Sequence, residues 1–237
     1  MEPSQPAQLT KKAVLTRQRI LESALHLFAS KGYAETSMRD IAGAAECSLG
    51  LTYRYFASKE ALVLELYIQL ITQLEEQARL LPAGTMADRF HHLMRAQLTF
   101  MAPHRLTLVA LTGAALNPYS RVGVFSAEGV AFRSRARAAY LPLVAEARDA
   151  PRAGQVDDLA TLLYGVQLAV ILFWLQDVSE GAQKTDEMLE FIHTVLGRVR
   201  PLLRLPWIAQ LLARLVQIIG PLLGREAAPG TAETRNK

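Results

Sequence analysis

Hydrophobic residues recur at helical spacing along almost the whole chain, and no segment shows the sustained apolar–polar alternation that is typical of a strand. In the first clear helix, expected from Thr16 to just before Gly32, the side chains of Ile20, Ala24 and Phe28 share one face. Glycine is expected to end this helix because it tolerates the left-handed backbone that often follows a helix C-terminus. The pattern therefore predicts an all-α fold.

Capping residues and helix breakers divide the rest of the chain. Ser37, followed three residues later by Asp40, is typical of a capping box that opens a short second helix. A third short helix is expected over residues 49–55, and Ser58 is expected to cap a long helix that ends near Leu81. Breaks that contain proline, glycine or acidic residues separate the further expected helices, at residues 86–101, 105–113, 127–147, 156–178, 185–200 and 206–223.

Composition is that of a folded chain from a reducing compartment. The 237 residues are 51% hydrophobic and 20% charged, which excludes global disorder, and residues 1–12 contain no apolar run typical of a secretory signal. The one cysteine, Cys47, excludes a disulfide framework and fits a cytoplasmic location. A net charge of +4 permits an anionic partner without requiring one.

The sequence gives little support for an enzyme. The histidines lack the spacing of known metal motifs, and the adjacent His91 and His92 cannot share one helix face. There is no glycine-rich phosphate loop or nucleophile elbow in the sequence. Arg133, Arg135 and Arg137 alternate within an expected helix and are interpreted as a solvated surface. We therefore expect no catalytic residues, no metal and no cofactor.

Residues 17–62 have the proportions of a helix-turn-helix. The last short helix begins at residues 48–50, where Leu49 and Gly50 add little bulk, so backbone and side chains can approach base edges. Arg54 can reach a guanine edge. Tyr53 and Tyr55 can donate hydrogen bonds to phosphate oxygens.

Helix N-termini also favour phosphate groups, because their backbone N–H groups are free and the helix dipole attracts negative charge. Ser37 and Ser48 lie at two expected helix starts, and Lys59 opens the long fourth helix. On periodicity alone, DNA binding and an ordinary trihelical unit are about equally expected; in the latter, Tyr53 and Tyr55 would only pack.

The string TRQRILESALHLFASKGYAETSMRDIAGAAECSLGLTYRYFASKEAL, residues 16–62, closely resembles the N-terminal DNA-binding domain of the TetR family of transcriptional regulators. The matching residues follow one uninterrupted order: Arg17, Ile20, Phe28, Gly32, Tyr33, Thr36, Ser37, Ile41, Ala42, Ala45, Ser48, Gly50, Tyr53, Phe56, Lys59 and Glu60. The match covers about a fifth of the chain and is specific because it is long and without gaps. In this family the remaining helices form a variable domain that dimerises and binds a ligand.

The resemblance implies a role for each matching position. Phosphate contacts are implied mostly for Ser37, Ser48, Tyr53, Tyr55 and Lys59. Base contacts are implied for Leu49, Gly50 and Arg54. The small trihelical core is implied to contain Ile20, Phe28, Ile41, Ala45 and Phe56.

Three residues depart from the family pattern and bear on the orientation of the recognition helix. Glu46 stands where glycine is common in the turn, which would cost about 1 kcal/mol if the backbone there is left-handed. Cys47 replaces a usual valine and can pack as a small hydrophobe. Thr52 replaces a usual aliphatic residue, for which the neighbouring Leu51 is expected to compensate.

Two apolar segments near the C-terminus raise the question of a membrane. Residues 159–176 carry no charge, but acidic residues flank them and polar side chains such as Gln167 interrupt them, so a spanning helix is not favoured. The resemblance implies that helices 156–178 and 185–200 form a dimeric four-helix bundle. Helix 206–223 extends beyond the usual family length and is expected to pack on this bundle or on the partner subunit. An interfacial membrane helix is the alternative, although it lacks the usual basic face.

The family builds its ligand pocket from the middle helices of the second domain. The candidate lining residues here are Met94, Leu98, Met101, Phe132, Tyr140, Tyr164, Gln167 and Trp174. Each alone is equally an ordinary core residue, but together they form the apolar set with few polar groups that is typical of small-molecule sites. A hydrophobic, neutral or weakly charged effector is expected. A charged ligand would need a buried counter-charge, for which Arg95 and Glu128 are candidates.

These observations predict a cytoplasmic, homodimeric, ligand-responsive regulator, most simply a repressor that releases a palindromic DNA operator when a hydrophobic small molecule binds. The expected parts are a flexible arm over residues 1–15, a helix-turn-helix domain over 16–62, a ligand-binding and dimerisation domain over 63–224 and a disordered tail over 225–237. No membrane partner is expected. The alternative is a membrane-associated or lipid-binding all-α protein without DNA binding.

Overall fold

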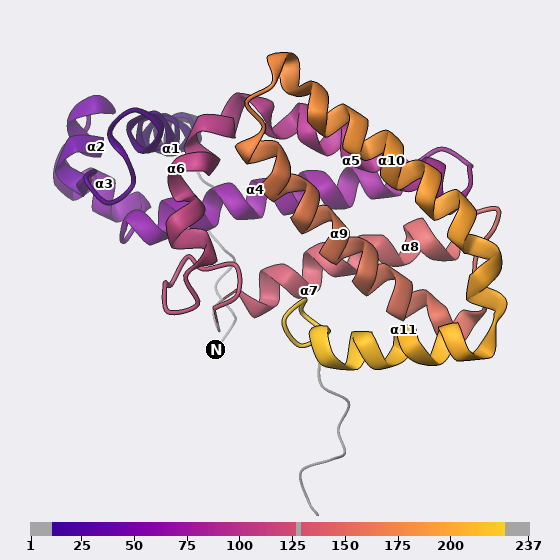
Figure 1. Ribbon diagram of the computed structural model, residues 1–237. Coiled ribbons are helices and arrows are strands. Elements are labelled where there is room, and N and C mark those ends of the chain that lie inside the picture. The colour runs from indigo at the N-terminus through magenta and orange to yellow at the C-terminus, as the bar shows by residue number, and fades with distance from the viewer. Residues whose placement is uncertain (1–10, 127–128, 226–237) are drawn as a thin grey trace, which may run out of the picture. The chain divides into compact units, whose positions relative to one another are not determined.

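The computed structural model describes residues 11–126 and 129–225, and these residues form helices and loops without any strand (Figure 1). The predicted all-α fold is confirmed. The expected tail lies, apart from residue 225, outside the described residues, as does the expected arm up to residue 10. Residues 11–15 of that arm are helical, because α1 (Lys11–Lys31) begins five residues before the expected start at Thr16.

The described residues divide into two compact units. The first contains the chain up to Leu66 together with residues 104–114, and the second contains residues 67–103 and 115–225. The first unit holds α1, α2 (Met38–Ala44), α3 (Leu49–Tyr55), the start of α4 (Lys59–Arg79) and most of α6 (Arg105–Leu116). Residues 104–114 were expected in the second domain, but their contacts group them with the first unit.

The first unit has the small apolar core that the family resemblance implies. Ile20 and Phe28 from α1, Ile41 from α2, and Ala45 and Phe56 from the ends of α2 and α3 are all buried. α2 packs against both α1 and α3. Residues spaced along one face of each helix thus fill one shared interior, which fixes the direction of α3.

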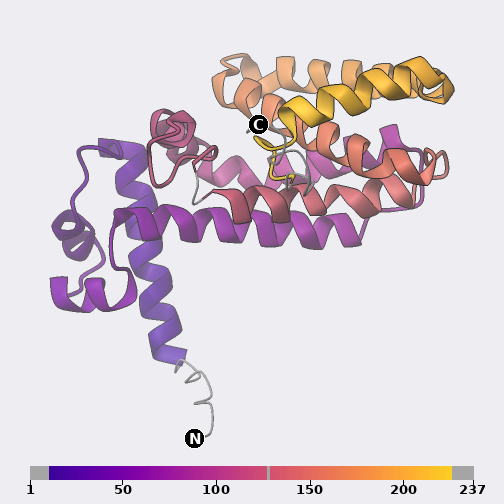
Figure 2. The ribbon, with the colours of Figure 1, turned by 90° about the horizontal axis from the view of Figure 1, so that it is seen from below.

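The second unit is a larger helical bundle. Its helices are the rest of α4, α5 (Met86–Met101), α7 (Val130–Ala138), α8 (Tyr140–Ala145), α9 (Val156–Gln176), α10 (Gln183–Val199) and α11 (Pro206–Ile219). Short 3-10 turns join them: η1 (Ala102–His104), η2 (Ala153–Gln155), η3 (Glu180–Ala182) and η4 (Arg200–Arg204). α5 packs along α10, α8 packs along α9, and α11, yellow in Figure 2, packs against α9 and η4.

The helix expected over residues 127–147 is not continuous, and that prediction was wrong. Residues 127–128 lie outside the described residues, and a break at Ala139 separates α7 from α8. Pro142 explains the break, because proline has no N–H to donate to the carbonyl of Ala138 and its ring disfavours helix at the preceding residue. The proline falls instead in the first turn of α8, where an N–H has no helical partner.

One described segment, Ala153–Gln176, is long and apolar enough to cross a membrane by length and composition, as is the bent pair Glu180–Leu203 and Pro206–Ile219 if it is counted as one span. A core helix of a soluble bundle meets the same criteria. One face of α9, which includes Leu163, Tyr164 and Val170, is buried inside the second unit. Leu172 and Phe173 on its other side are exposed, so α9 is apolar all round although only one face is covered.

Candidate nucleic-acid interface and effector site

The N-terminus of α2 is fixed by the predicted capping box, which the structure confirms. The Ser37 hydroxyl accepts a hydrogen bond from the backbone N–H of Asp40 at 3.2 Å, and the Asp40 carboxylate accepts one from the backbone N–H of Ser37 at 2.8 Å. The Ser37 hydroxyl and the Lys31 ammonium also donate to this carboxylate. These hydrogen bonds, first of all that from the Ser37 hydroxyl, hold the Asp40 pKa well below its ordinary value.

Asp40→Asn is expected to lower the melting temperature at neutral pH, and the difference from wild type is expected to shrink in acid. Because folding lowers the Asp40 pKa below its ordinary 3.8, the stabilisation by the ionised carboxylate is present above that pH and is lost as the pH falls through the folded-state pKa. Thermal unfolding of both proteins from about pH 3 to pH 7 checks this. A difference that stays constant over the range would contradict it.

The turn between α2 and α3 is left-handed at Glu46, which has a φ of 51°. The penalty of about 1 kcal/mol for a non-glycine residue in a left-handed backbone conformation therefore applies to Glu46. Cys47 is half-buried, and its sulfur accepts a hydrogen bond from the Arg19 guanidinium at 3.4 Å. Thr52 is fully buried, and its hydroxyl donates to the carbonyl of Ser48 at 3.1 Å. A polar residue is tolerated in this core because its hydroxyl is hydrogen-bonded within α3.

Glu46→Gly is expected to raise the free energy of unfolding by ~0.5–1 kcal/mol. Removing the Cβ relieves about 1–2 kcal/mol of left-handed strain, and the greater chain entropy of glycine offsets about 0.5–1 kcal/mol of that gain. Glu35→Gly is the matched control, since Glu35 is an exposed residue of the same unit without a positive φ, and it should be neutral or destabilising. Urea denaturation of the three proteins measures both effects. Destabilisation by Glu46→Gly would contradict the strain.

The face that α3 presents to solvent is small at its N-terminal end and polar further along. Ser48 caps the helix by accepting a hydrogen bond from the Leu51 N–H at 3.2 Å. Ser48 and Gly50 are exposed, and a Cβ built on Gly50 would meet no atom within 4 Å. The other expected DNA-contacting residues of α3 also reach the surface: Tyr53 and Arg54 are exposed, and Leu49 and Tyr55 are half-exposed. This face is free to approach the edges of base pairs.

Lys59 has partners of its own within the first unit. Its ammonium donates to the carbonyls of Tyr33 at 2.8 Å and Ala34 at 3.2 Å, and it lies 4.7 Å from the centroid of the Tyr33 ring. Lys59 thus ties the start of α4 to the loop after α1. Because an ammonium has three N–H donors, one remains for a phosphate oxygen.

Arg17 joins α1 to α4 and to the end of α3, through contacts that the sequence does not predict. Its guanidinium forms two hydrogen bonds with the Glu65 carboxylate, at 2.7 and 2.5 Å, and lies 4.7 Å from the centroid of the Phe56 ring. Glu65 raises the Arg17 pKa by accepting these bonds. Since Phe56 is the C-cap of α3, Arg17 helps to fix where α3 ends. A 48-residue separation between the two ion-pair partners gives no local sequence signal.

The expected effector residues lie in the second unit, and all are buried except Phe132, which is half-buried. The Tyr140 hydroxyl lies 3.9 Å from the Met94 sulfur, and the Tyr140 and Tyr164 ring centroids are 6.3 Å apart. Burial raises the pKa of both tyrosines, so both remain neutral at physiological pH. The Gln167 side-chain amide donates to the Gln97 side-chain oxygen at 2.8 Å, whereas the Gln167 oxygen has no hydrogen-bond partner.

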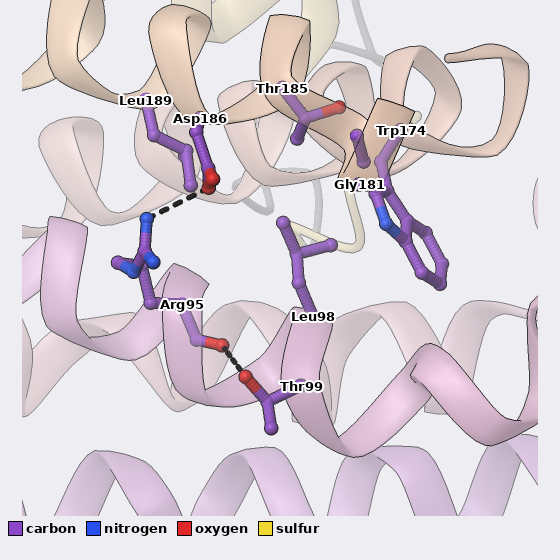
Figure 3. Close-up of a pocket in the computed structure, with 9 residues that line it drawn as sticks. Arg95, Leu98, Thr99, Trp174, Gly181, Thr185, Asp186 and Leu189 are labelled. Atoms are coloured by element: carbon purple, nitrogen blue, oxygen red, sulfur yellow. Dashed lines mark hydrogen bonds and ion pairs between the residues drawn. The ribbon is translucent and has the colours of Figure 1, made fainter. Parts of the chain in front are cut away.

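A cavity of about 240 Å³ opens beside this set, between α5, the end of α9, η3 and the start of α10 (Figure 3). Leu98, Trp174 and Leu189 supply its apolar wall. The Arg95 guanidinium lies 2.8 Å from the Asp186 carboxylate at its edge, so the candidate counter-charge Arg95 is already paired. Of the expected effector residues, only Leu98 and Trp174 line the cavity. The others pack in the interior of the unit.

The interpretation of the α7 arginines as a solvated surface was wrong for Arg133. This side chain is only 5% exposed, and its Nη1 atom donates to the carbonyls of Val124 and Ser126, the latter at 3.0 Å. Arg135 is exposed and pairs with Glu75, and Arg137 is half-buried and pairs with Asp157. Periodicity offered a signal, because Arg133 shares a helical face with the buried Ala136 and Tyr140.

Comparisons with known proteins agree with both units. Residues 20–66 match the family model of bacterial regulatory proteins of the tetR family, and residues 89–199 match that of the tetracyclin repressor-like C-terminal domain. The uncharacterized HTH-type transcriptional regulator YuxN of Bacillus subtilis is 41% identical over 86 residues, covering 35% of this chain and 28% of that protein. The probable acrEF/envCD operon repressor of Escherichia coli is 36% identical over 82 residues, covering 35% of this chain and 37% of that protein.

Solved structures extend the likeness over most of the chain. Salmonella enterica GusR has a TM-score of 0.64 and 24% identity, covering 81% of this chain and 98% of that chain. Mycobacterium smegmatis AmtR has a TM-score of 0.51 and 25% identity, covering 81% and 89%. This chain spans less than half the length of the two curated relatives, whereas its fold resembles these two structures over 81% of its own length. α11 follows the last residue that either family model matches.

Proposed function

Because this chain belongs to the TetR family of transcriptional regulators, we propose that it is a cytoplasmic, homodimeric repressor that leaves a palindromic operator when a small hydrophobic molecule binds. The observation that carries the proposal is the surface of α3. The short helices α2 and α3 are both capped and pack on one small core, and the N-terminal end of α3 is exposed and open around Gly50. A helix with these properties suits the major groove.

The proposed contacts divide between bases and phosphates. Leu49, Gly50 and Arg54 approach base edges, Arg54 as the donor for guanine. The proposed phosphate contacts are made by Ser37, Ser48, Tyr53, Tyr55 and Lys59. For Ser37 and Ser48, the backbone N–H groups at the starts of α2 and α3 support this role, because their hydroxyls already accept capping hydrogen bonds.

Exposed apolar residues on α9 and α10 support the proposed dimer. They are Leu172 and Phe173 on α9 and Phe191, Val195 and Val199 on α10. The α10 residues are spaced four apart and so form one stripe along the helix. An apolar stripe of this size is typical of a protein–protein contact, and a second copy of the chain would cover it symmetrically.

The effector is proposed to bind among the buried residues of the second unit. The set combines an apolar wall with the Gln97–Gln167 amide pair, which leaves one acceptor unused. Binding is proposed to favour a dimer conformation in which the two α3 helices no longer match successive major grooves about 34 Å apart.

This function is tested by selecting, from a pool of random duplex DNA, the sequences that the wild-type protein binds. We expect enrichment of an inverted repeat whose half-sites are centred about 10 base pairs apart, or a multiple of that spacing, because two identical chains read it. Failure to enrich any sequence would contradict the proposal. Flotation of the protein with phospholipid vesicles in the same preparation would then favour the membrane-associated alternative.

A further inference from the structure

Arg133 is a cation that lies almost fully inside the protein. Its guanidinium forms no ion pair with a carboxylate of the described residues, in contrast to the neighbouring Arg135 and Arg137, which both have one. Its Nη1 atom donates to two backbone carbonyls, and its Nε atom has no hydrogen-bond partner in the part of the chain that the structure describes. The Nε atom is therefore an unused donor in the interior of the protein.

A buried guanidinium with an unused N–H donor is unfavourable unless an anion accepts a hydrogen bond from it. A buried charge loses its hydration, and two carbonyl dipoles replace only part of it. Burial accordingly lowers the Arg133 pKa from its ordinary value. The Nε–Nη2 edge of a guanidinium is one of those that bind a carboxylate through two parallel hydrogen bonds, which is the strongest form of such a contact.

Arg133 lies on the face of α7 that also holds the buried Ala136, and α7 packs against α8 and α9, which carry Tyr140 and Tyr164. The Arg133 charge lowers the Tyr164 pKa, against the larger rise that burial causes. Tyr164 lies beside Tyr140, which in turn contacts Met94. One turn further along α9, Gln167 offers its unpartnered oxygen. The cation thus lies at one end of a buried apolar set that has a hydrogen-bond acceptor within it.

We propose that Arg133 binds the anionic head group of the effector, and that the effector is an amphipathic monocarboxylate whose apolar body lies against Tyr140, Tyr164 and Met94. The inference rests on the proposed function, since it names the chemical class of the small molecule that the second unit takes. Arg133 replaces Arg95, which is paired with Asp186, as the candidate counter-charge; the other candidate, Glu128, lies outside the described residues.

Access to Arg133 requires the second unit to rearrange. Tyr140, Tyr164, Met94 and Gln167 are each almost fully buried, so their side chains fill the space that the ligand body would take. Met94 is suited to move because its side chain is unbranched and flexible. Binding therefore selects an opened conformation, which is what an effector must do to alter the protein's affinity for DNA.

Matched ligand pairs test the head-group preference on the wild-type protein without DNA. The probes are dodecanoate against dodecan-1-ol, and 4-phenylbutyrate against 4-phenylbutan-1-ol, titrated by calorimetry and by tryptophan fluorescence, which Trp174 reports. In at least one pair the acid is expected to bind about 10-fold or more tightly than its alcohol, as a charge-assisted hydrogen bond implies. Equal affinity within both pairs, tighter binding of the alcohols, or binding of neither acid overturns the assignment.

Variants at Arg133 test whether this residue causes the preference for the acid over its alcohol. Arg133→Met is expected to abolish the preference for the acid and to change the affinity for the alcohol by less than about 3-fold, and Arg135→Met, which removes an exposed arginine, should leave both unchanged. Because Arg133→Met also frees two carbonyls, Arg133→Lys is the second variant, and it should keep a reduced preference. An undiminished preference in folded Arg133→Met overturns the assignment.

The outcomes separate this inference from the proposed function. If an acid binds through Arg133 but does not release DNA, the proposed effector-controlled repressor is contradicted, whereas the anion site at Arg133 stands. If a neutral compound binds more tightly than its acid and releases DNA, the proposed repressor stands, whereas the anion site at Arg133 is contradicted.

Discussion

Gly50→Trp is expected to abolish specific operator binding while leaving the fold unchanged. No atom lies within 4 Å of a Cβ at Gly50, so the indole has room in the free protein. On DNA the same side chain would occupy the space between α3 and the base edges, and several direct contacts worth about 1–3 kcal/mol each would be lost. Fluorescence anisotropy with the selected operator should show at least about a 100-fold loss in affinity.

Gly113→Trp is the matched control for this prediction. Gly113 is an exposed helical glycine of the same unit, on α6, and a Cβ there also meets no atom within 4 Å. Its substitution should change operator affinity by less than about 3-fold and should shift the circular dichroism as little as Gly50→Trp does. Unchanged operator binding by folded Gly50→Trp would show that α3 is not the recognition helix.

Phe191→Glu is expected to convert the dimer to a monomer. Phe191 is 68% exposed on α10 in the single chain, and the proposed interface would cover it with the partner's apolar residues. A carboxylate there would have to lose its hydration without a counter-charge, which costs several kcal/mol. Sedimentation equilibrium should show at least about a 100-fold weaker dimer, and affinity for the palindrome should fall with it because two half-sites are read by two chains.

Val178→Glu is the control for the interface. Val178 is also apolar and 99% exposed, but it follows the end of α9 and lies outside the stripe on α10. The same change of charge should leave the dimer and the palindrome affinity unaltered. A wild type that is monomeric at micromolar concentration, or a Phe191→Glu dimer as stable as the wild type, would reject the interface.

Local signals in the sequence predicted the DNA-binding unit well. Ser37 and Asp40 make the expected capping box, and the apolar residues of each short helix meet in one core, because caps and helical periodicity act over only a few residues. Strain at Glu46 was predicted only for the case that its backbone is left-handed. A backbone conformation with positive φ follows from how the two helices are docked, and the identity of the residue does not determine it.

The second unit was predicted less completely, because its features depend on contacts between distant segments. Burial of Met94, Tyr140 and Tyr164 followed from apolar character, but the shape of the cavity depends on which side chains meet from α5, α9 and α10. Arg133 was assigned to solvent because it alternates with Arg135 and Arg137, and alternate positions point to different faces of a helix. Its environment consists of two carbonyls from a loop seven and nine residues away, and no helical pattern predicts that loop's path.

The central claim is that this chain binds a palindromic operator as a dimer through α3. Its most direct test is to titrate the wild type against the selected operator and against the same operator with five base pairs inserted between the half-sites. We expect two chains per duplex and an affinity that falls steeply between about 50 and 200 mM salt. We also expect tight binding to be lost on insertion, since half a turn rotates one half-site to the opposite face of the DNA. Equal binding to both duplexes with no dependence on salt would contradict it.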